Sequence, residues 1–401
     1  MKQKTLLMLG GGFLQNYVIK KAKSLGYRVL VLDGNPSAVG FKEADEYEVI
    51  NIVDEEACLK YARKHNIDGV LTAATDFSVL SMSRVSEEMG LPGIKYSAAK
   101  RIKNKAAVRK CLFEANADDT GYSYEIDSVD AMSQIMPRIH FPIMMKPCDG
   151  SGSRGASRVD NADDFERACL YAMNGSMTHR AVAEPFVVGQ EYGVESFVDN
   201  GVIHVLGIMR KDMTKPPYYA ELGHSIPSGL PPDIEEKVIS CVESSLIALD
   251  VNHGSVNMDL IIGTGNDIHI VDVGARMGGN LIGSHIIPIG TGIDYMENMI
   301  RAAVGDSTDF NPVREPIAIA TKLLALTPGK IKKLPDFLWL ANKFGVLIEH
   351  HLNVGDTIRE YHTNLDGCGY VIATGDDAVD ASIKAVRALK AIDEMIVRED
   401  E

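Results

Sequence analysis

Two aspartates, Asp259 and Asp272, have the spacing that best suits chemistry. They lie in VNMDLIIGTGNDIHIVDVGAR, residues 256–276, where two alternating apolar runs flank a short turn, a pattern that predicts a β-hairpin. If Gly263 pairs with Ile268, Asp259 lies directly opposite Asp272. Paired carboxylates sit roughly 4.5–5.5 Å apart, so they repel unless a proton or a cation lies between them. Mg²⁺ suits this pair because one or two carboxylates plus substrate phosphates commonly hold it, and Mn²⁺ is an alternative.

Alternation along this hairpin predicts one apolar and one polar face. The apolar face is expected to hold Met258, Leu260, Ile262, Val271 and Val273, and the polar face Asn257, Asp259, Asp272 and Gly274. Arg276 continues the polar face. A guanidinium fixed beside a metal pair is the arrangement expected around a phosphoryl group in transfer. A solvated hairpin with splayed acids is the alternative.

A glycine-serine loop follows Lys146, in KPCDGSGSRG at residues 146–155. The loop lacks the lysine that follows the last glycine of a P-loop, so phosphate binding would depend on Lys146. Its flexible backbone could turn several N–H groups toward one anion, as a lid over a nucleotide would. A surface hairpin loop is the alternative.

Three glutamates cluster in AEPFVVGQEYGVE, residues 183–195. Glu191, beside a turn, could accept hydrogen bonds from a ribose diol, and extended backbone near residues 184–187 could pair with an adenine edge. A solvated acidic face is the alternative. At the N-terminus, GGGFLQ and Asp33 resemble a dinucleotide fingerprint, although Leu14 or Gln15 stands where the third glycine is expected. This leaves an NAD-dependent oxidoreductase as a further alternative.

The elements that would position these residues form three regions. The first ninety residues alternate short apolar runs with amphipathic ones, which predicts a doubly wound, Rossmann-like parallel sheet. A helix is predicted from Ser97 to Glu114. Antiparallel strands follow from Phe141, including a hairpin at Asp199-Asn200-Gly201. A smaller α+β region begins near Asn311 and ends in a helix over residues 376–395.

The composition restricts the class of protein. The net charge of −14 over 401 residues disfavours polyanion binding, so we expect no nucleic-acid partner. The six cysteines form no C-x-x-C pair, which favours a reducing, cytoplasmic setting without zinc or disulfides. We expect no membrane segment, because every long stretch free of charge is rich in glycine and polar residues. A homodimer is left open.

The order of these regions resembles the ATP-grasp superfamily of carboxylate-amine ligases over nearly the whole chain. The resemblance implies a Rossmann-like domain at residues 1–94, an ATP-grasp domain at 95–310 with a lid at roughly 137–187, and a C-terminal α+β domain at 311–401. It implies an enzyme that activates a carboxylate as an acyl phosphate for attack by an amine, with release of ADP. ATP and Mg²⁺ are the implied cofactors.

The resemblance also implies a role for each motif. Lys105 and Lys146 would contact phosphates, and Asp259 and Asp272 would hold magnesium. Arg276 and Lys146 would act on the phosphoryl group. The remaining ATP contacts would come from a flap at Ser151, Gly152, Ser153 and Gly155, a hinge at Glu184, Pro185, Phe186 and Val187, and the ribose acceptor Glu191.

Within the superfamily, KPPYYAELGHSIPSGL and DVGARMGG look most like ATP-dependent amino-acid ligases. This likeness implies small carboxylate and amine substrates near Glu221, His224, Gly278, Gly279 and Asn280. Phosphoribosylglycinamide synthetases have a similar layout and supply an alternative function, and an ATP-sensing regulator without turnover is another.

Two departures from the family pattern stand out. The second metal motif is usually E-x-N-x-R, but here Gly274 replaces the amide ligand, with Asn257 a candidate substitute. Asn104 stands before Lys105, where Asp is common.

Overall fold

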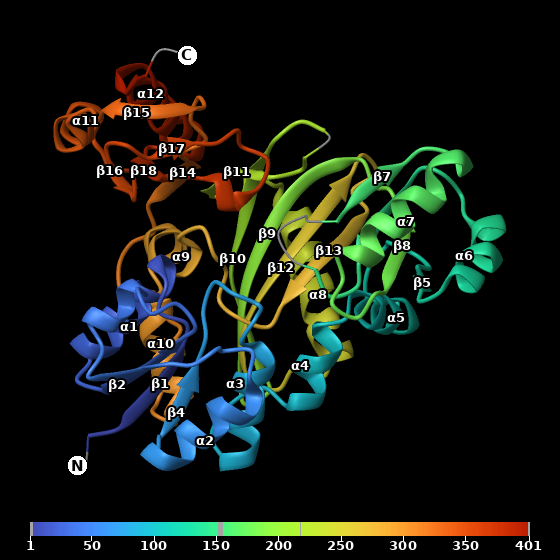
Figure 1. Ribbon diagram of the computed structural model, residues 1–401, viewed down its shortest axis with the longest axis horizontal. Helices are drawn as coiled ribbons and strands as arrows, with labels where there is room; N and C mark the ends of the chain where they lie inside the picture. Colours follow the sequence, from blue (N-terminus) through green and yellow to red (C-terminus); the bar gives the residue numbers. More distant parts are fainter. Residues whose placement is uncertain (1–2, 151–154, 217, 400–401) are drawn as a thin grey trace.

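The computed structural model describes residues 3–150, 155–216 and 218–399 and arranges them as lobes around one long sheet (Figure 1). The N-terminal lobe has a parallel sheet of order β3-β2-β1-β4, as predicted for a Rossmann-like lobe. Its elements are β1 (Thr5–Leu9), α1 (Phe13–Ser24), β2 (Arg28–Asp33), β3 (Glu46–Val49), α2 (Glu55–His65), β4 (Gly69–Leu71) and α3 (Val79–Met89).

Both faces of this parallel sheet are buried. Leu7 and Leu9 of β1 pack into one apolar cluster, whereas Leu6 and Met8 pack into a cluster on the opposite face. Strands buried on both faces need continuous apolar sequence rather than alternation, which explains the run TLLML. The rigid sheet fixes the loop after β4, which reaches the site described below.

The segment between the first two lobes is two helices rather than the single predicted helix. α4 (Tyr96–Ile102) ends before Asn104, and α5 (Lys105–Ala115) begins after it. Asn104 has extended backbone and accepts a hydrogen bond from Ala107 N at 3.1 Å, so it caps α5. Asn supplies the same capping oxygen as Asp. Asn104 in place of Asp therefore still caps the helix that carries Lys105.

A small antiparallel sheet of order β5-β8-β6-β7 forms the lobe on the right of Figure 1. Its elements are β5 (Tyr124–Ile126), α6 (Val129–Ile135), β6 (Ile143–Pro147), β7 (Ser157–Val159), α7 (Phe165–Asn174) and β8 (Ala181–Pro185). β6 and β7 flank the glycine-serine loop, so this loop joins two paired strands. Because β5 belongs to the same sheet, the small lobe includes residues before 137, where the predicted lid starts.

An eight-stranded antiparallel sheet runs through the centre in the order β13-β12-β9-β10-β11-β14-β18-β16. The central strands are β9 (Gly189–Asp199), β10 (Val202–Met213), β11 (Glu221–Ile226), β12 (Gly254–Gly263) and β13 (Ile268–Gly274). The predicted hairpin at Asn200-Gly201 is confirmed, with positive φ values of 50° and 87° at its two turn residues. Helices α8 (Pro232–Ala248), α9 (Ile287–Thr291) and α10 (Tyr295–Ala303) complete the region.

The C-terminal region is continuous with that sheet. It adds β14 (Ala318–Leu323), β16 (Val346–His350) and β18 (Gly369–Gly375), covered by α12 (Ala378–Met395). A smaller group holds β15 (Gly329–Lys333), α11 (Phe337–Phe344), β17 (Thr357–Ile358) and β19 (Val397–Arg398). No helix in the described part of the chain could span a membrane. The predicted domain boundaries stay predictions.

Candidate active site

The hairpin of β12 and β13 places Asp259 opposite Asp272, as predicted. The register around them differs from the prediction, because Ile262 rather than Gly263 pairs with Ile268. A bulge then adds one residue to β13 before Asp272 and restores the aspartate pair. The bulge also shifts the side-chain alternation beyond it.

The predicted position of Val271 on the apolar face is therefore wrong. Ile270 is 1% exposed and packs in the core with Met258 and Leu260, whereas Val271 is only half-buried. The other predicted members of the face, Ile262 and Val273, are in the core cluster. The bulge at Val271 leaves its carbonyl oxygen available to a side chain from the small lobe.

That side chain is Lys146, at the end of β6. Its Nζ lies 3.2 Å from Val271 O and forms an ion pair with Glu184 of β8. Glu184, the first residue of the predicted hinge, is only 6% exposed, and its carboxylate is paired with Lys146 within the protein. Lys146 thus lies beside Asp272, as the predicted phosphate site requires.

Lys105, the first residue of α5, forms an ion pair with Asp272. Its backbone N–H donates to Cys148 O at 2.7 Å, which ties the start of α5 to the segment before the glycine-serine loop. Burial opposes the charge on Lys105, but Asp272 outweighs this effect, so the lysine pKa is raised. Two predicted phosphate-binding lysines therefore converge on β13 from different elements.

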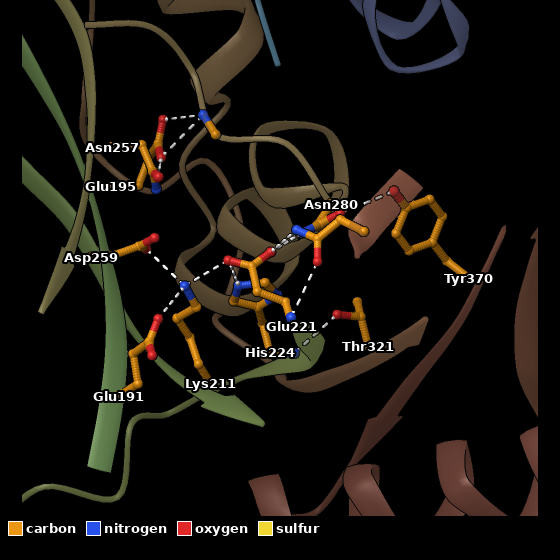
Figure 2. A network of polar contacts seen from close by, with 12 residues as sticks. Glu191, Glu195, Lys211, Glu221, His224, Asn257, Asp259, Asn280, Thr321 and Tyr370 are labelled. Atoms are coloured by element: carbon orange, nitrogen blue, oxygen red, sulfur yellow. Dashed lines mark hydrogen bonds and ion pairs between the residues drawn. The ribbon is translucent and has the colours of Figure 1, made fainter. Parts of the chain in front are cut away.

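Lys211 of β10 is the centre of a buried charge network (Figure 2). The side chain is 1% exposed, and its Nζ lies 2.8 Å from Glu191, 2.5 Å from Glu221 and 3.0 Å from Asp259. Between β10 and β12 lies Gly193 of β9, where a Cβ would be 3.7 Å from both Lys211 Cδ and Asp259 Oδ1. A larger side chain there would crowd the space through which the ammonium reaches Asp259.

One ammonium shared by three carboxylates leaves the cluster negative. Burial raises the pKa of Asp259 to about 7, because the neighbouring carboxylates of Glu221 and Glu191 add to the burial effect and Lys211 offsets only part of it. Burial also acts on Glu221, but Lys211 and His224 outweigh it and lower its pKa to about 2. A dication near Asp259 would relieve this excess of negative charge.

Glu221 and His224 lie on strand β11 and both face this network (Figure 2). Asn280 donates its side-chain amide to Glu221, so the two predicted substrate residues meet. Burial lowers the pKa of His224 to about 4, which keeps its imidazole neutral at pH 7. His224 Nδ1 is buried and has no hydrogen-bond partner among the described residues.

Arg276 lies against the N-terminal lobe. Its Nε is 3.0 Å from Asp76 Oδ1, and one terminal nitrogen is 3.1 Å from Asp76 Oδ2. Nη1 is buried without a hydrogen-bond partner in the part of the chain that the structure describes. Gly274 makes this pose available, because a Cβ there would lie 3.0 Å from the guanidinium carbon. A buried, unpaired guanidinium donor suits an anionic ligand.

The loop after Arg276 is held by Glu195 of β9, which is fully buried. Glu195 accepts hydrogen bonds from Tyr295 at 2.6 Å, Asn257 at 3.0 Å and Gly278 N at 3.1 Å. Burial raises the pKa of Glu195 to about 7 against the effect of these donors. Gly278 and Asn257 thus have hydrogen-bond partners within the protein. Gly279 follows in the same loop, and a Cβ on it would lie 3.7 Å from Leu14 Cδ1.

The remaining predicted ATP contacts lie around the small lobe. Ser151, Gly152 and Ser153 lie outside the described residues. Gly155 has a φ of 75°, and a Cβ there would meet Pro147 Cγ at 2.6 Å, so this position requires glycine. In the hinge, β8 ends at Pro185, Phe186 N donates to Pro142 O at 3.1 Å, and Val187 continues beyond the strand.

A pocket opens between the lobes at this point, and its lining includes the charged side chains of Asp76, Lys103, Lys105, Asp149 and Asp272 together with Gly274. Among the described residues, no group of three or more His, Cys, Asp or Glu side chains could hold a metal ion. The donor set nevertheless fits a Mg²⁺ that takes its other ligands from phosphates, because Asp259 and Asp272 supply two hard oxygen donors beside lysines.

Sequence reasoning missed two residues of this site. Lys211 stands in RKDM, which has the pattern of a solvated strand end, and Asp76 stands in a loop. The one available signal for Lys211 was the hairpin at Asn200-Gly201, which places it near the glutamates of β9. Nothing in the local sequence links Asp76 to Arg276, which is 200 residues away.

The N-terminal glycine turn is occupied by the chain's own side chains. Asp33 Oδ2 accepts from Gly11 N at 2.8 Å, so the carboxylate that fits the dinucleotide fingerprint is bonded to the turn. Gln15 donates to Ala73 O at 2.7 Å, and its side chain lies over Gly12, where a Cβ would be 2.8 Å from Oε1. These contacts give the oxidoreductase alternative no support.

Comparison with known proteins agrees with this geometry. Residues 139–284 match the ATP-grasp domain family, and residues 322–394 match the L-amino acid ligase C-terminal domain 2 family. The fold is similar to an L-amino acid ligase from Bacillus licheniformis (TM-score 0.83, 20% identity, 100% of both chains). It is also similar to a phosphoribosylglycinamide synthetase from Anaerococcus prevotii (TM-score 0.77, 20% identity, 100% of both chains).

Two relatives are similar in sequence. An uncharacterized protein of Sinorhizobium fredii is 23% identical over 94% of this chain and 79% of its own length. A formate-dependent phosphoribosylglycinamide formyltransferase of Bacteroides thetaiotaomicron is 27% identical over 43% of this chain, and the match spans 45% of that relative. Residues 139–284 thus form an ATP-grasp domain, within a fold that the chain shares with these two solved structures.

Proposed function

We propose that the protein joins a carboxylate to an amine through an acyl phosphate, with amino acids or similar small molecules as substrates. The observation that carries the proposal is the convergence of Lys105, Lys146 and Arg276 on the polar end of β13, next to the Asp259 and Asp272 pair. The match of residues 322–394 to an L-amino acid ligase domain supports amino-acid substrates.

In the proposed reaction, the carboxylate oxygen of the first substrate attacks the γ-phosphorus of ATP, and ADP leaves. The amine of the second substrate then attacks the acyl carbon, and inorganic phosphate leaves as the C–N bond forms. No nucleophile from the protein is required. Catalysis would come from positioning and charge stabilisation in a site screened from water.

Each charged residue has a part in this scheme. Lys105 and Lys146 would exchange their carboxylate partners for phosphate oxygens, and the unpaired Nη1 of Arg276 would bind the transferred phosphoryl group. Asp259 and Asp272 would hold Mg²⁺, which supplies charge neutralisation for the phosphates when bound. Glu221, neighbouring Asn280 and neutral His224 would line the substrate end.

A phosphoribosylglycinamide synthetase-like reaction is the second candidate, because a solved structure of that name has the same fold over the full chain. A reducing, cytoplasmic setting is supported by the six cysteines, all of which are free thiols. A homodimer stays a prediction.

The test is a screen for ADP release with Mg-ATP over pairs of amino acids, with phosphoribosylamine plus glycine included. Hydroxylamine in place of the amine should trap the acyl phosphate as a hydroxamate. We expect ADP and phosphate in equal amounts with at least one amino-acid pair. Release of AMP would show adenylation and contradict the proposal.

A further inference from the structure

The C-terminal region reaches the substrate end of the site through Asn364. Its side chain forms a two-way contact with Glu221: Glu221 N donates to Asn364 Oδ1 at 3.1 Å, and Asn364 Nδ2 donates to Glu221 Oε2 at 2.8 Å. Tyr361 donates its hydroxyl to the backbone oxygen of Glu221. A segment 140 or more positions away thus holds three groups of Glu221: its backbone N–H, its backbone oxygen and its carboxylate.

The segment that makes these contacts is a braced turn, residues 361–366. Asp366 Oδ2 accepts from Thr363 N at 2.9 Å, Thr363 Oγ1 at 3.0 Å and His362 N at 3.2 Å. On its outer side, the His362 ring stacks on Tyr218, with centroids 4.1 Å apart. Because the turn is bonded internally and packed against the β10–β11 connection, it can hold Glu221 in one position.

A second connection from the same region reaches Asn280. Tyr370 of β18 donates to Asn280 Oδ1 at 3.1 Å, and Asn280 donates onward to Glu221 (Figure 2). Asn280 and Leu281 have positive φ values of 50° and 63°, a conformation that a leucine adopts only when its surroundings impose it. The C-terminal region therefore orients both polar residues of the substrate end.

We propose that the turn at residues 361–366 is a positioning element that sets substrate affinity through Glu221, with Asn364 as its principal residue. This inference rests on the proposed ligase function. In the described part of the chain, Asn364 and Tyr361 form no hydrogen bond or ion pair with Lys105, Lys146 or Asp272, so changes in the turn should act on the amino-acid substrates and spare ATP.

The experiment compares full-length wild type with Asn364→Leu, which keeps side-chain size and removes both hydrogen bonds. Asn342→Leu, an exposed site on α11 of the same region, is the matched control. We expect Asn364→Leu to raise KM for the amino-acid substrates about tenfold, with KM for ATP changed less than twofold. Tyr361→Phe, which removes the bond to the Glu221 backbone oxygen and a 3.4 Å bond to Asn364 Oδ1, should give a smaller rise in the same direction and replaces Asn364→Leu if that variant fails to fold.

Hydrogen exchange provides a readout that needs no turnover. The Glu221 amide should exchange at least about tenfold faster in Asn364→Leu than in wild type, because its acceptor is lost. Unchanged exchange, an unchanged substrate KM, or parallel rises in both KM values would overturn the inference. If wild type has no ligase activity, the proposed function fails, and the substrate role of the turn fails with it. Hydrogen exchange would still decide whether the turn at residues 361–366 holds Glu221 in place.

Discussion

Asp259 and Asp272 lie at paired positions of β12 and β13, yet each carboxylate forms an ion pair with a different lysine: Asp259 shares Lys211 with two glutamates, whereas Asp272 pairs with Lys105. The chain thus supplies a counter-charge of its own to Asp272 and only a shared one to Asp259. Binding of Mg-ATP would exchange partners, with metal on the carboxylates and Lys105 on a phosphate. Because charges are exchanged rather than created, the site can stay folded in both states.

The first prediction concerns the metal role of Asp272. Asp272→Asn should lower ADP formation by about a hundredfold or more, because the amide cannot supply the anionic oxygen that holds the metal. Circular dichroism and thermal unfolding should remain close to wild type. Asp233→Asn, at an exposed position in the first turn of α8, is the control and should keep full activity. Normal turnover by Asp272→Asn would refute the metal role.

The second prediction concerns the buried cation. Lys211→Met should lower the free energy of unfolding by about 3–5 kcal/mol, because removal of one partner leaves buried carboxylates without their counter-charge. Mg²⁺ should restore part of this loss, and urea unfolding with and without Mg²⁺ measures both effects. Lys237→Met, on the exposed side of α8, should change stability by less than about 0.5 kcal/mol. Equal stability of the two variants would show that Lys211 has no such role.

The sequence could predict the parts of the site that depend on local pattern. Alternation and the short turn predicted the hairpin and the pairing of Asp259 with Asp272, although a bulge in β13, and not the predicted register, produces that pair. The strand before the glycine-serine loop predicted the place of Lys146. The resemblance of whole motifs supplied Lys105 and Arg276. The hairpin could be predicted because period-two alternation and turn chemistry depend on neighbouring residues, whereas the roles of Lys105 and Arg276 stay predictions.

Two β-bulges, one at Val271 in β13 and one at Leu206 in β10, account for much of the site geometry that could not be predicted. If the pairing of Val202 with Asp199 continued without interruption, Lys211 would lie opposite Gln190. A bulge at Leu206 shifts the register of β10 by one residue, so that Arg210 pairs with Tyr192. Lys211 therefore comes level with Glu191. A bulge inserts one unpaired residue for reasons of packing across the sheet, and such packing leaves no mark in the local pattern.

The third prediction is a pH dependence of stability that arises from Glu195. Its pKa is raised from 4.5 to about 7, so between these values the folded chain binds more protons than the unfolded chain. Stability from this group is therefore greatest below about pH 4.5 and falls as pH rises to 7. Glu195→Gln lacks the titration. Between pH 5 and 8, the wild type should lose up to about 3 kcal/mol relative to this variant in urea unfolding. Parallel pH profiles would contradict the assignment.

The last prediction tests what glycine does at position 274, where the family usually has an amide ligand. Gly274→Asn should lower ADP formation about tenfold rather than improve metal binding, because a Cβ there would lie 3.0 Å from the Arg276 guanidinium carbon and 3.1 Å from Asp76 Oδ1. Gly274→Ala adds the same Cβ without an amide and should lose activity to a similar extent. Activity in the Asn variant above wild type, with a loss only in the Ala variant, would show instead that the site lacks a metal ligand. Equal losses would mean that the glycine exists to let Arg276 lie against Asp76.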